Sequence, residues 1–267
     1  MCAIKLIQDK AYKVYHLELS RELSRGARAA LIPGAPERAA LIAESLKDRQ
    51  KVASHRGLDT WVGELAGEPV LAVNTGMGGP TTEIVVQELI QLGVTCFLRI
   101  GTTGSIRADV PVGALVISEA AIRLDGTSDH YAPPCYPAAA DFELTMHLAR
   151  AARLTDRKVV RGITVSSASF YPGQERLDSA SGYVYRDFQG SLEQWRALGA
   201  LNYEMEAGTL FTMCRTMGLS AGAVCAVVAN RTESEAVHRD EIRRGEDAAI
   251  CVGVGGLAAY LEETRNR

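Results

Sequence analysis

The chain has 267 residues, of which 47% are hydrophobic and 23% charged, and its formal net charge at pH 7 is -3. This length and composition suit one α/β domain, or two small ones, with a buried core. The slightly acidic balance argues against a nucleic-acid or acidic-membrane surface, because both need a basic excess. The first residues lack the apolar core of a signal peptide and no apolar run reaches membrane-spanning length, so we predict a cytoplasmic protein.

The first candidate residues lie around the first predicted core strand, Ala29 to Ile32. His16 precedes this strand, and a lone histidine of this kind is more often a local hydrogen bonder than a ligand. A turn follows the strand, and a helix is predicted from about Pro36 through Leu46. Gly34 would leave the backbone open to a ligand, with Arg38 one helical turn further on. Without other support, the pattern favours an ordinary loop with a solvated arginine.

A hairpin is predicted next, from the strands Lys51 to His55 and Leu58 to Leu65, with Arg56 at its bend. The chain then returns through Ala66 to Pro69 into a short apolar strand, Val70 to Val73. This strand leads directly into the segment around which the rest of the chain is organised.

Two glycine-rich segments frame the next predicted helix. A turn, Gly76 to Gly79, leads into a helix that starts near Pro80 and stops at Gly93. A strand, Thr95 to Ile100, carries Arg99 and opens directly into a second turn, Gly101 to Gly104. We expect this β-α-β unit to place both turns at the ends of neighbouring strands. Their backbone N–H groups, together with the arginine, would form a shallow cup suited to an anion such as phosphate.

Two common phosphate-binding motifs are absent from this segment. No Gly-Lys-Ser/Thr follows the glycines, and their spacing misses the dinucleotide pattern G-x-G-x-x-G. The alternative interpretation is that the glycines only make tight turns, and periodicity alone leaves both interpretations open.

The six cysteines are scattered through the sequence, without a C-x-x-C pair and without histidines at the spacing of metal ligands. Disulfide and metal sites are therefore poorly supported. Most of the cysteines fall in apolar strand or helix patterns, which predicts free thiols that act as small hydrophobes. We expect no metal site.

A polar stretch follows two further predicted strands, Gly113 to Leu124 and Lys158 to Ser166, which are separated by a helix, Ala138 to Leu154. Within the stretch that ends at Arg176, Phe170 precedes a Pro-Gly turn, and Gln174 and Arg176 are two positions apart. In extended chain, such positions share a face. An amide beside a guanidinium matches the edge of a uracil ring, against which an aromatic ring can pack. From composition alone, a solvated polar loop is favoured.

Two glutamates mark the start of another predicted helix. Asn202 is expected to cap it, and Glu204 and Glu206 then fall in its first turn, where the helix dipole favours a carboxylate. Capping is therefore one interpretation. The other is that a carboxylate at this junction accepts both hydrogen bonds of a ribose diol. A last strand, Ala221 to Ala229, a polar loop from Glu233 and a final helix, Asp247 to Glu262, complete the chain; the GVGG run inside that helix predicts close packing.

Four segments, NTGMGGP, FLRIGTTGSI, FYPGQER and NYEMEAGTLFTMC, make the sequence similar to the nucleoside phosphorylase family. The resemblance extends from about Val14 to the last helix, and FYPGQER resembles the pyrimidine branch. It implies one α/β domain, residues 1–267, with a mixed, mostly parallel central sheet flanked by helices. It also implies phosphate-dependent cleavage of uridine to uracil and ribose 1-phosphate in pyrimidine salvage, with phosphate as co-substrate and no cofactor.

The resemblance also implies roles for single residues. Phosphate would be held by Gly34, Arg38, Arg56, Arg99 and Thr102. Uracil would be held by Thr103, Gly104, Phe170, Gln174 and Arg176. Ribose would be held by His16, Thr102, Glu204, Met205 and Glu206. The residues that act on the reacting atoms would be Arg99, Glu206, Gln174 and Arg176.

In this family, His16 and Arg56 would reach into the site of a neighbouring subunit, which implies a homo-oligomer with a dimer as its minimal active unit and a hexamer as its complete form. Two positions depart from patterns in the family. Gly57 replaces a glutamate that helps to hold an interface potassium ion in bacterial pyrimidine members, so that ion is in doubt. Asn230 replaces the aspartate of the purine members, and an amide cannot donate a proton to a purine leaving group as an acid does.

Three alternatives remain at this point: a purine nucleoside phosphorylase, a nucleosidase that uses water, and a non-catalytic nucleoside-binding or storage protein. Three arginines, at positions 38, 56 and 99, argue against water as the nucleophile. The pair of Gln174 and Arg176 argues against a purine base. Only an assay of turnover separates the enzyme from the storage protein, because the same residues would bind the nucleoside in both.

Overall fold

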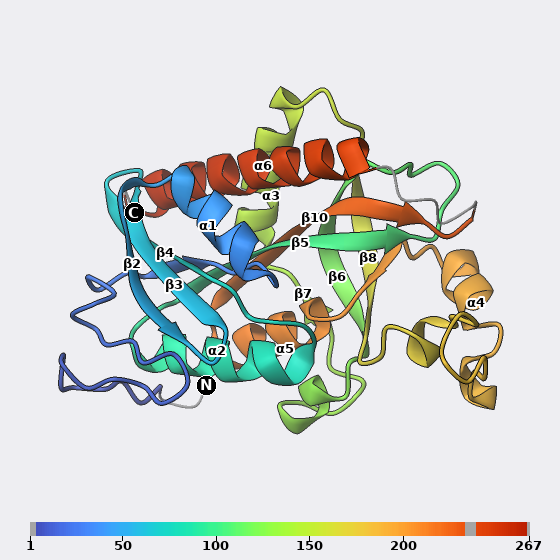
Figure 1. The fold of residues 1–267 in the computed structure, drawn as a ribbon, viewed down its shortest axis with the longest axis horizontal. Helices are drawn as coiled ribbons and strands as arrows, with labels where there is room; N and C mark the ends of the chain where they lie inside the picture. Colours follow the sequence, from blue (N-terminus) through green and yellow to red (C-terminus); the bar gives the residue numbers. More distant parts are fainter. Residues whose placement is uncertain (1–3, 233–238, 266–267) are drawn as a thin grey trace.

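A computed structural model of the chain describes residues 4–232 and 239–265 (Figure 1). The strands are β1 (Ala29–Leu31), β2 (Lys47–His55), β3 (Leu58–Leu65), β4 (Glu68–Val73), β5 (Cys96–Ser105), β6 (Leu115–Leu124), β7 (Ala138–Ala139), β8 (Val159–Ser167), β9 (Asn202–Glu204) and β10 (Ser220–Asn230). The helices are α1 (Pro36–Glu44), α2 (Gly79–Gln91), α3 (Phe142–Ala151), α4 (Ser191–Ala197), α5 (Ala207–Met217) and α6 (Arg239–Arg265). The α/β fold class is as predicted.

One mixed sheet contains all of these strands, in the order β10-β6-β8-β9-β5-β1-β4-β3-β2, with β7 paired to β6. Strand β10 also pairs with β5, so that β5, β10, β6, β8 and β9 close into a ring from which the other strands extend. Parallel pairing joins β4, β1, β5 and β10, whereas β2, β3 and β4 form an antiparallel meander. The carboxyl ends of the four parallel strands therefore meet at one edge.

Helices cover both faces of the sheet (Figure 1). Helices α2 and α5 lie on one face, where Val85, Leu89 and Phe211 pack against Phe97 of β5. Helices α1, α3 and α6 lie on the other face, against residues such as Leu98. Because successive strand residues point to opposite faces, Arg99 shares the α2–α5 face with Phe97, and this position decides which groups it meets.

The prediction of a second glycine turn at residues 101–104 is wrong, because β5 continues to Ser105. Residues 101–103 pair in parallel with Cys225 to Val227 of β10, and Gly104 pairs with Tyr203 of β9. The ends of β4 and β5 are not neighbours either, since β1 lies between them. Only the turn before α2 remains of the predicted cup.

Three predicted helix starts also differ. The helix predicted from Ala138 starts at Phe142, because Asp141 caps it by accepting a hydrogen bond from the backbone of Leu144. Asn202 caps no helix and belongs to β9. Helix α6 begins at Arg239, eight residues before the predicted start, and part of the polar loop predicted from Glu233 lies outside the described residues.

Close packing of the GVGG run in α6 is confirmed. A Cβ atom on Gly253 would lie 2.5 Å from Cδ1 of Ile100, and one on Gly256 would lie 2.8 Å from Cδ2 of Leu148. The absence of side chains thus lets α6 lie directly on β5 and α3. That contact fixes the position of α6, which also carries Glu246, a residue near the site.

Candidate active site

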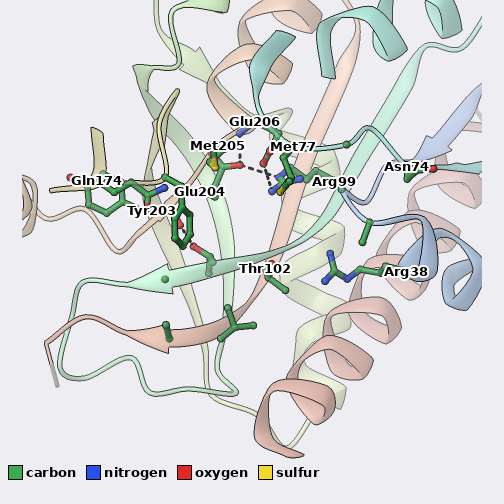
Figure 2. Close-up of a pocket in the computed structure, with 18 of the residues that line it drawn as sticks. Arg38, Asn74, Met77, Arg99, Thr102, Gln174, Tyr203, Glu204, Met205 and Glu206 are labelled. Atoms are coloured by element: carbon green, nitrogen blue, oxygen red, sulfur yellow. Dashed lines mark hydrogen bonds and ion pairs between the residues drawn. The ribbon is translucent and has the colours of Figure 1, made fainter. Parts of the chain in front are cut away.

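A cavity of about 520 Å³ lies at the carboxyl ends of β1, β4, β5, β9 and β10 (Figure 2). Twelve predicted site residues line it: Gly34, Arg38, Arg99, Thr102, Thr103, Gly104, Phe170, Gln174, Arg176, Glu204, Met205 and Glu206. Gly76 and Met77, from the predicted glycine turn before α2, line it as well. The lining residues that were not predicted for the site are Ala35, Pro36, Gly57, Asn74, Tyr203, Val228 and Ala229. His16 and Arg56 are not among the lining residues. One pocket therefore gathers the three predicted subsites apart from these two side chains.

Arg99 lies in the floor of the pocket between two carboxylates (Figure 2). It is 5% exposed, its Nε donates to Oε2 of Glu204 at 3.0 Å, and its Nη2 forms an ion pair with Glu206. Burial lowers the pKa of the guanidinium, but the two carboxylates raise it overall, so Arg99 stays charged. Gly101 makes room for it, because a Cβ atom there would lie 2.9 Å from Nη2 of Arg99.

The prediction that both glutamates fall in the first turn of the helix is wrong, because Glu204 ends β9 and Glu206 is the residue just before α5. The carboxylate of Glu204 nevertheless accepts hydrogen bonds from the backbone N–H of Glu206 and of Ala207, both at 2.9 Å, and so caps the start of α5 from the strand. Burial raises the pKa of Glu204, while Arg99 opposes the rise. Glu206 instead accepts a hydrogen bond of 2.5 Å from the backbone of Gly78, which places its carboxylate at the N-terminus of α2 as well.

Arg38 approaches the pocket from α1, and Figure 2 shows its side chain on the side of Thr102. Its guanidinium is bound by Glu246 of α6, a residue that the sequence analysis did not consider. No local pattern marks Glu246, because it is 208 positions away in the chain. The arginines at 38 and 99 both have acidic partners, so each charge is balanced within the chain.

Two neighbouring threonines of β5 have different surroundings. Thr103 is buried, and its hydroxyl donates to the carbonyl of Tyr203 at 2.6 Å and accepts from the amide of Asn202 at 2.6 Å. Its hydroxyl thus already joins β5 to β9. Thr102 points to the other face of the strand, toward the side of Arg38, and is half-buried.

The segment with Gln174 and Arg176 reaches the pocket by a different route from the one predicted. It is not extended, because residues 172–174 form a 3₁₀ turn and Glu175 adopts a left-handed conformation with φ 53°. Both Gln174 and Arg176 are nevertheless buried and line the cavity. The ring of Phe170, 46% exposed, packs on the guanidinium of Arg176 at 4.3 Å.

Hydrogen bonds from Arg231 and to Glu175 hold this turn in place. Nη1 of Arg231, just after β10, donates to the carbonyl of Gln174 at 2.5 Å. The carboxylate of Glu175 accepts from the backbone N–H of Leu192 in α4 at 2.7 Å and from that of Gly190. The left-handed residue therefore points its side chain out to α4, while its two neighbours face the cavity.

His16 and Arg56 both contact Tyr15, and neither lines this chain's own cavity. Nη2 of Arg56 donates to the hydroxyl of Tyr15 at 3.1 Å, and the rings of Tyr15 and His16 meet edge to face with their centroids 4.9 Å apart. Gly57 lines the cavity, but the side chain of Arg56 turns away to Tyr15. The structure thus groups the two residues without bringing them to the other site residues.

Asn230 lies just beyond the lining residues Val228 and Ala229 and has a different role from theirs. Its amide donates to the carbonyls of Arg107 at 3.2 Å and of Val110 at 3.1 Å, and its oxygen accepts from the backbone N–H of Thr232 at 2.9 Å. These bonds fully engage the side chain in holding the end of β10. It does not project into the cavity, since its neighbours supply the lining.

Within residues 4–232 and 239–265, no group of three or more side chains is arranged to hold a metal ion. In the same part of the chain, none of the helices is both long enough and apolar enough to cross a membrane. The polar side chains that line the cavity are those of arginines, glutamates, threonines, a tyrosine and the amides Asn74 and Gln174.

All residues that line the cavity lie in the part of the chain that matches one protein family. A model of the Phosphorylase superfamily matches residues 28–253, a range that includes every cavity residue from Gly34 to Ala229. A uridine phosphorylase from Haemophilus influenzae is 47% identical over 248 residues, which cover 93% of this chain and 98% of the relative. The uridine phosphorylases from Escherichia coli and Salmonella typhimurium are 47% and 46% identical, with the same coverage.

Proposed function

Because the chain belongs to the phosphorylase superfamily, we propose that it cleaves uridine with phosphate and yields uracil and ribose 1-phosphate in pyrimidine nucleoside salvage. The observation that carries the proposal is one cavity with a cationic side, a carboxylate and an amide–guanidinium pair. Arg38 and Arg99 lie on the cationic side, and Gln174 lies near the far end (Figure 2). Arg176 also lines the cavity. Phosphate matches the cationic side of the cavity, and the base of a nucleoside matches the amide–guanidinium pair.

On the phosphate side, we assign Gly34, Arg38, Arg99 and Thr102 to the nucleophile, with Arg56 supplied by a partner subunit. Guanidinium groups bind a phosphate through two parallel hydrogen bonds, which also orients one of its oxygens. That oxygen forms the new bond to C1′ of ribose, while the bond from C1′ to N1 of uracil breaks with its electron pair on the base. Phosphate-binding arginines disfavour a nucleosidase, because water as nucleophile has no use for them.

For the ribose, we assign Glu206 to the diol, with Met205 beneath the sugar, Glu204 as the support of Glu206, and His16 supplied by a partner. A carboxylate accepts both diol hydrogen bonds. It also stabilises the oxocarbenium character that the ring gains as the bond to uracil breaks. Glu206 also forms an ion pair with Arg99, so the residue assigned to the diol contacts a residue assigned to phosphate.

For the base, we assign Gln174 and Arg176 to the uracil edge, with Phe170 against its face and Thr103 and Gly104 beneath it. Uracil leaves as an anion whose charge is spread over its carbonyl oxygens. The guanidinium of Arg176 stabilises that charge, and N1 then takes a proton from solvent. A purine would require an acid near its imidazole ring, and the position that holds an aspartate in the purine members is Asn230 here, which is engaged in backbone contacts.

The wider arrangement also stays a prediction. We propose that residues 1–267 form one cytoplasmic domain that assembles into a homohexamer built from dimers, and that the reaction needs no cofactor. Gly57 has no side chain to offer an interface potassium ion, so we propose none there. The grouping of His16 and Arg56 away from their own cavity supports an exchange of these residues across a two-fold axis.

Replacing Gln174 with alanine is expected to lower kcat/KM for uridine by about a hundredfold, because polar atoms of the base would remain unpaired in a closed site. Initial rates of uracil release at saturating phosphate measure the loss. Gln194→Ala serves as the matched control, since Gln194 is exposed on α4 and does not line the cavity. Equal rates in the Gln174→Ala and Gln194→Ala proteins would contradict the assignment of the base edge.

A further inference from the structure

Glu88 of α2 binds the segment that carries His16 through a set of close contacts. Its Oε1 lies 2.8 Å from the backbone nitrogen of His16 and 2.7 Å from the ring Nδ1. Its Oε2 lies 2.9 Å from the backbone nitrogen of Leu17. Glu88 is only 8% exposed, so this carboxylate is buried against the groups it binds. A buried charge is tolerated when it is paired and hydrogen-bonded in this way.

All three groups that face the carboxylate must donate hydrogen bonds to it. An ionised carboxylate has only acceptor sites, and a backbone N–H has only a donor. Nδ1 of His16 must therefore carry a proton, and in a neutral ring Nε2 is then the acceptor. Within the described residues, Nε2 of His16 has no hydrogen-bond partner, and the side chain is about one third exposed, at 35%. The ring thus presents a single acceptor outward.

Further contacts hold the same short segment from the other side. Nδ1 of His55, at the end of β2, donates to the carbonyl oxygen of His16 at 3.0 Å. Tyr15 packs edge to face on His16 and accepts a hydrogen bond from Arg56. The backbone N–H, the backbone carbonyl and the ring of His16 are therefore all fixed, by Glu88 of α2, by His55 of β2 and by the neighbouring Tyr15. Such fixing is what a side chain needs if it must meet a ligand with little loss of entropy.

We propose that Glu88 is a positioning residue that holds His16 as its Nδ1-protonated tautomer, so that Nε2 accepts a hydrogen bond from the ribose 5′-hydroxyl in a partner's site. The inference rests on the proposed function of His16. Glu88 itself does not touch the substrate; it acts through the imidazole. A purely structural role would need only the two backbone contacts, whereas the contact at Nδ1 selects the tautomer.

Glu88→Gln tests this role because the amide has the same shape as the carboxylate but cannot accept hydrogen bonds from all three of the N–H groups around it. Whichever way it turns, its NH₂ group faces a backbone N–H or the Nδ1 proton, so two donors oppose each other. We expect the ratio of kcat/KM for uridine to kcat/KM for 5′-deoxyuridine to fall about tenfold relative to the unaltered protein. Both substrates are measured on one preparation, so a loss of active protein cancels in the ratio.

Glu83→Gln is the matched control, since Glu83 is on the same helix but binds Tyr131 rather than His16. Its ratio should be unchanged. His16→Ala should lower the ratio at least as far as Glu88→Gln, and the double variant should be no worse than His16→Ala alone. If the Glu88→Gln protein has no activity on either nucleoside, the ratio is measured for Glu88→Asp instead. Aspartate keeps the negative charge, but its shorter side chain holds the carboxylate further from the ring of His16. A lowered ratio supports the proposal and an unchanged ratio contradicts it.

The outcomes separate this inference from the function on which it rests. If His16→Ala leaves the ratio unchanged, the assignment of His16 to the 5′-hydroxyl is wrong, and that of Glu88 falls with it. If His16→Ala lowers the ratio but Glu88→Gln does not, only the role of Glu88 is wrong. If the unaltered protein cleaves neither nucleoside with phosphate, the proposed reaction itself is contradicted.

Discussion

Arg99→Lys is expected to lower kcat/KM for the phosphorolysis of uridine by about a hundredfold or more, with a raised KM for phosphate. Lysine keeps one positive charge but lacks the planar fork that binds two phosphate oxygens at once. In the structure, Arg99 also bridges Glu204 and Glu206, and an ammonium group is a poorer bridge than a guanidinium. Steady-state rates with phosphate and uridine varied independently measure both effects.

Lysine is a better test here than alanine. Removing the cation would leave the carboxylates of Glu204 and Glu206 buried without compensation, which would cost about 3 kcal/mol or more of the free energy of unfolding. Loss of activity in Arg99→Ala would therefore confound folding with chemistry. Arg150→Lys is the matched control, because Arg150 is exposed on α3. An Arg99→Lys protein with the kcat and the phosphate KM of this control would refute the phosphate role.

Subunit mixing is expected to restore activity from two inactive proteins. A His16→Ala, Arg56→Ala double variant should be inactive because it cannot complete its partner's site, and Glu206→Ala because it cannot hold the ribose. When the two proteins are dissociated, mixed and reassembled, each mixed dimer should contain one intact site and one doubly damaged site. Activity should then return at up to about half of the sites in mixed dimers.

The structure motivates this experiment, because His16 and Arg56 contact Tyr15 rather than the cavity of their own chain. The mass of the reassembled species shows whether mixed dimers have formed, and each parent protein taken through the same procedure alone is the control. Should mixed dimers form and remain inactive, the two residues act within their own subunit or not at all. If activity returned on mixing although no mixed dimers had formed, the dimer would not be the minimal active unit.

Local sequence patterns predicted the α/β alternation, because glycine, proline and apolar spacing act over a few residues, whereas most of the site residues were implied by the resemblance to the nucleoside phosphorylase family. The turn before α2 is as predicted, with Gly76 at φ 73° and Gly78 at φ 89°. The same reasoning failed at residues 101–104, where two glycines suggested a turn. There, pairing of β5 with β10 and β9 on either side holds the chain extended, and Gly101 is needed to accommodate the side chain of Arg99.

The electrostatic partners were beyond the reach of local patterns. Arg38 and Arg99 were assigned to phosphate, but their acidic partners were not predicted. Glu246, which binds Arg38, is 208 positions away from it, and Glu204, which binds Arg99, is 105 positions away. Gln174 and Arg176 were predicted to share a face, and they do line one cavity, yet the reason given was wrong. A left-handed residue between them, not an extended strand, directs both side chains inward.

The most direct test of the proposed reaction is the release of uracil from uridine by the purified protein, measured with and without phosphate and with inosine in a parallel reaction. The account predicts that uracil appears only when phosphate is present, with one ribose 1-phosphate formed for each uracil, and that uridine is cleaved faster than inosine. Uracil release at the same rate without phosphate, faster cleavage of inosine, or binding of uridine without any turnover would contradict it.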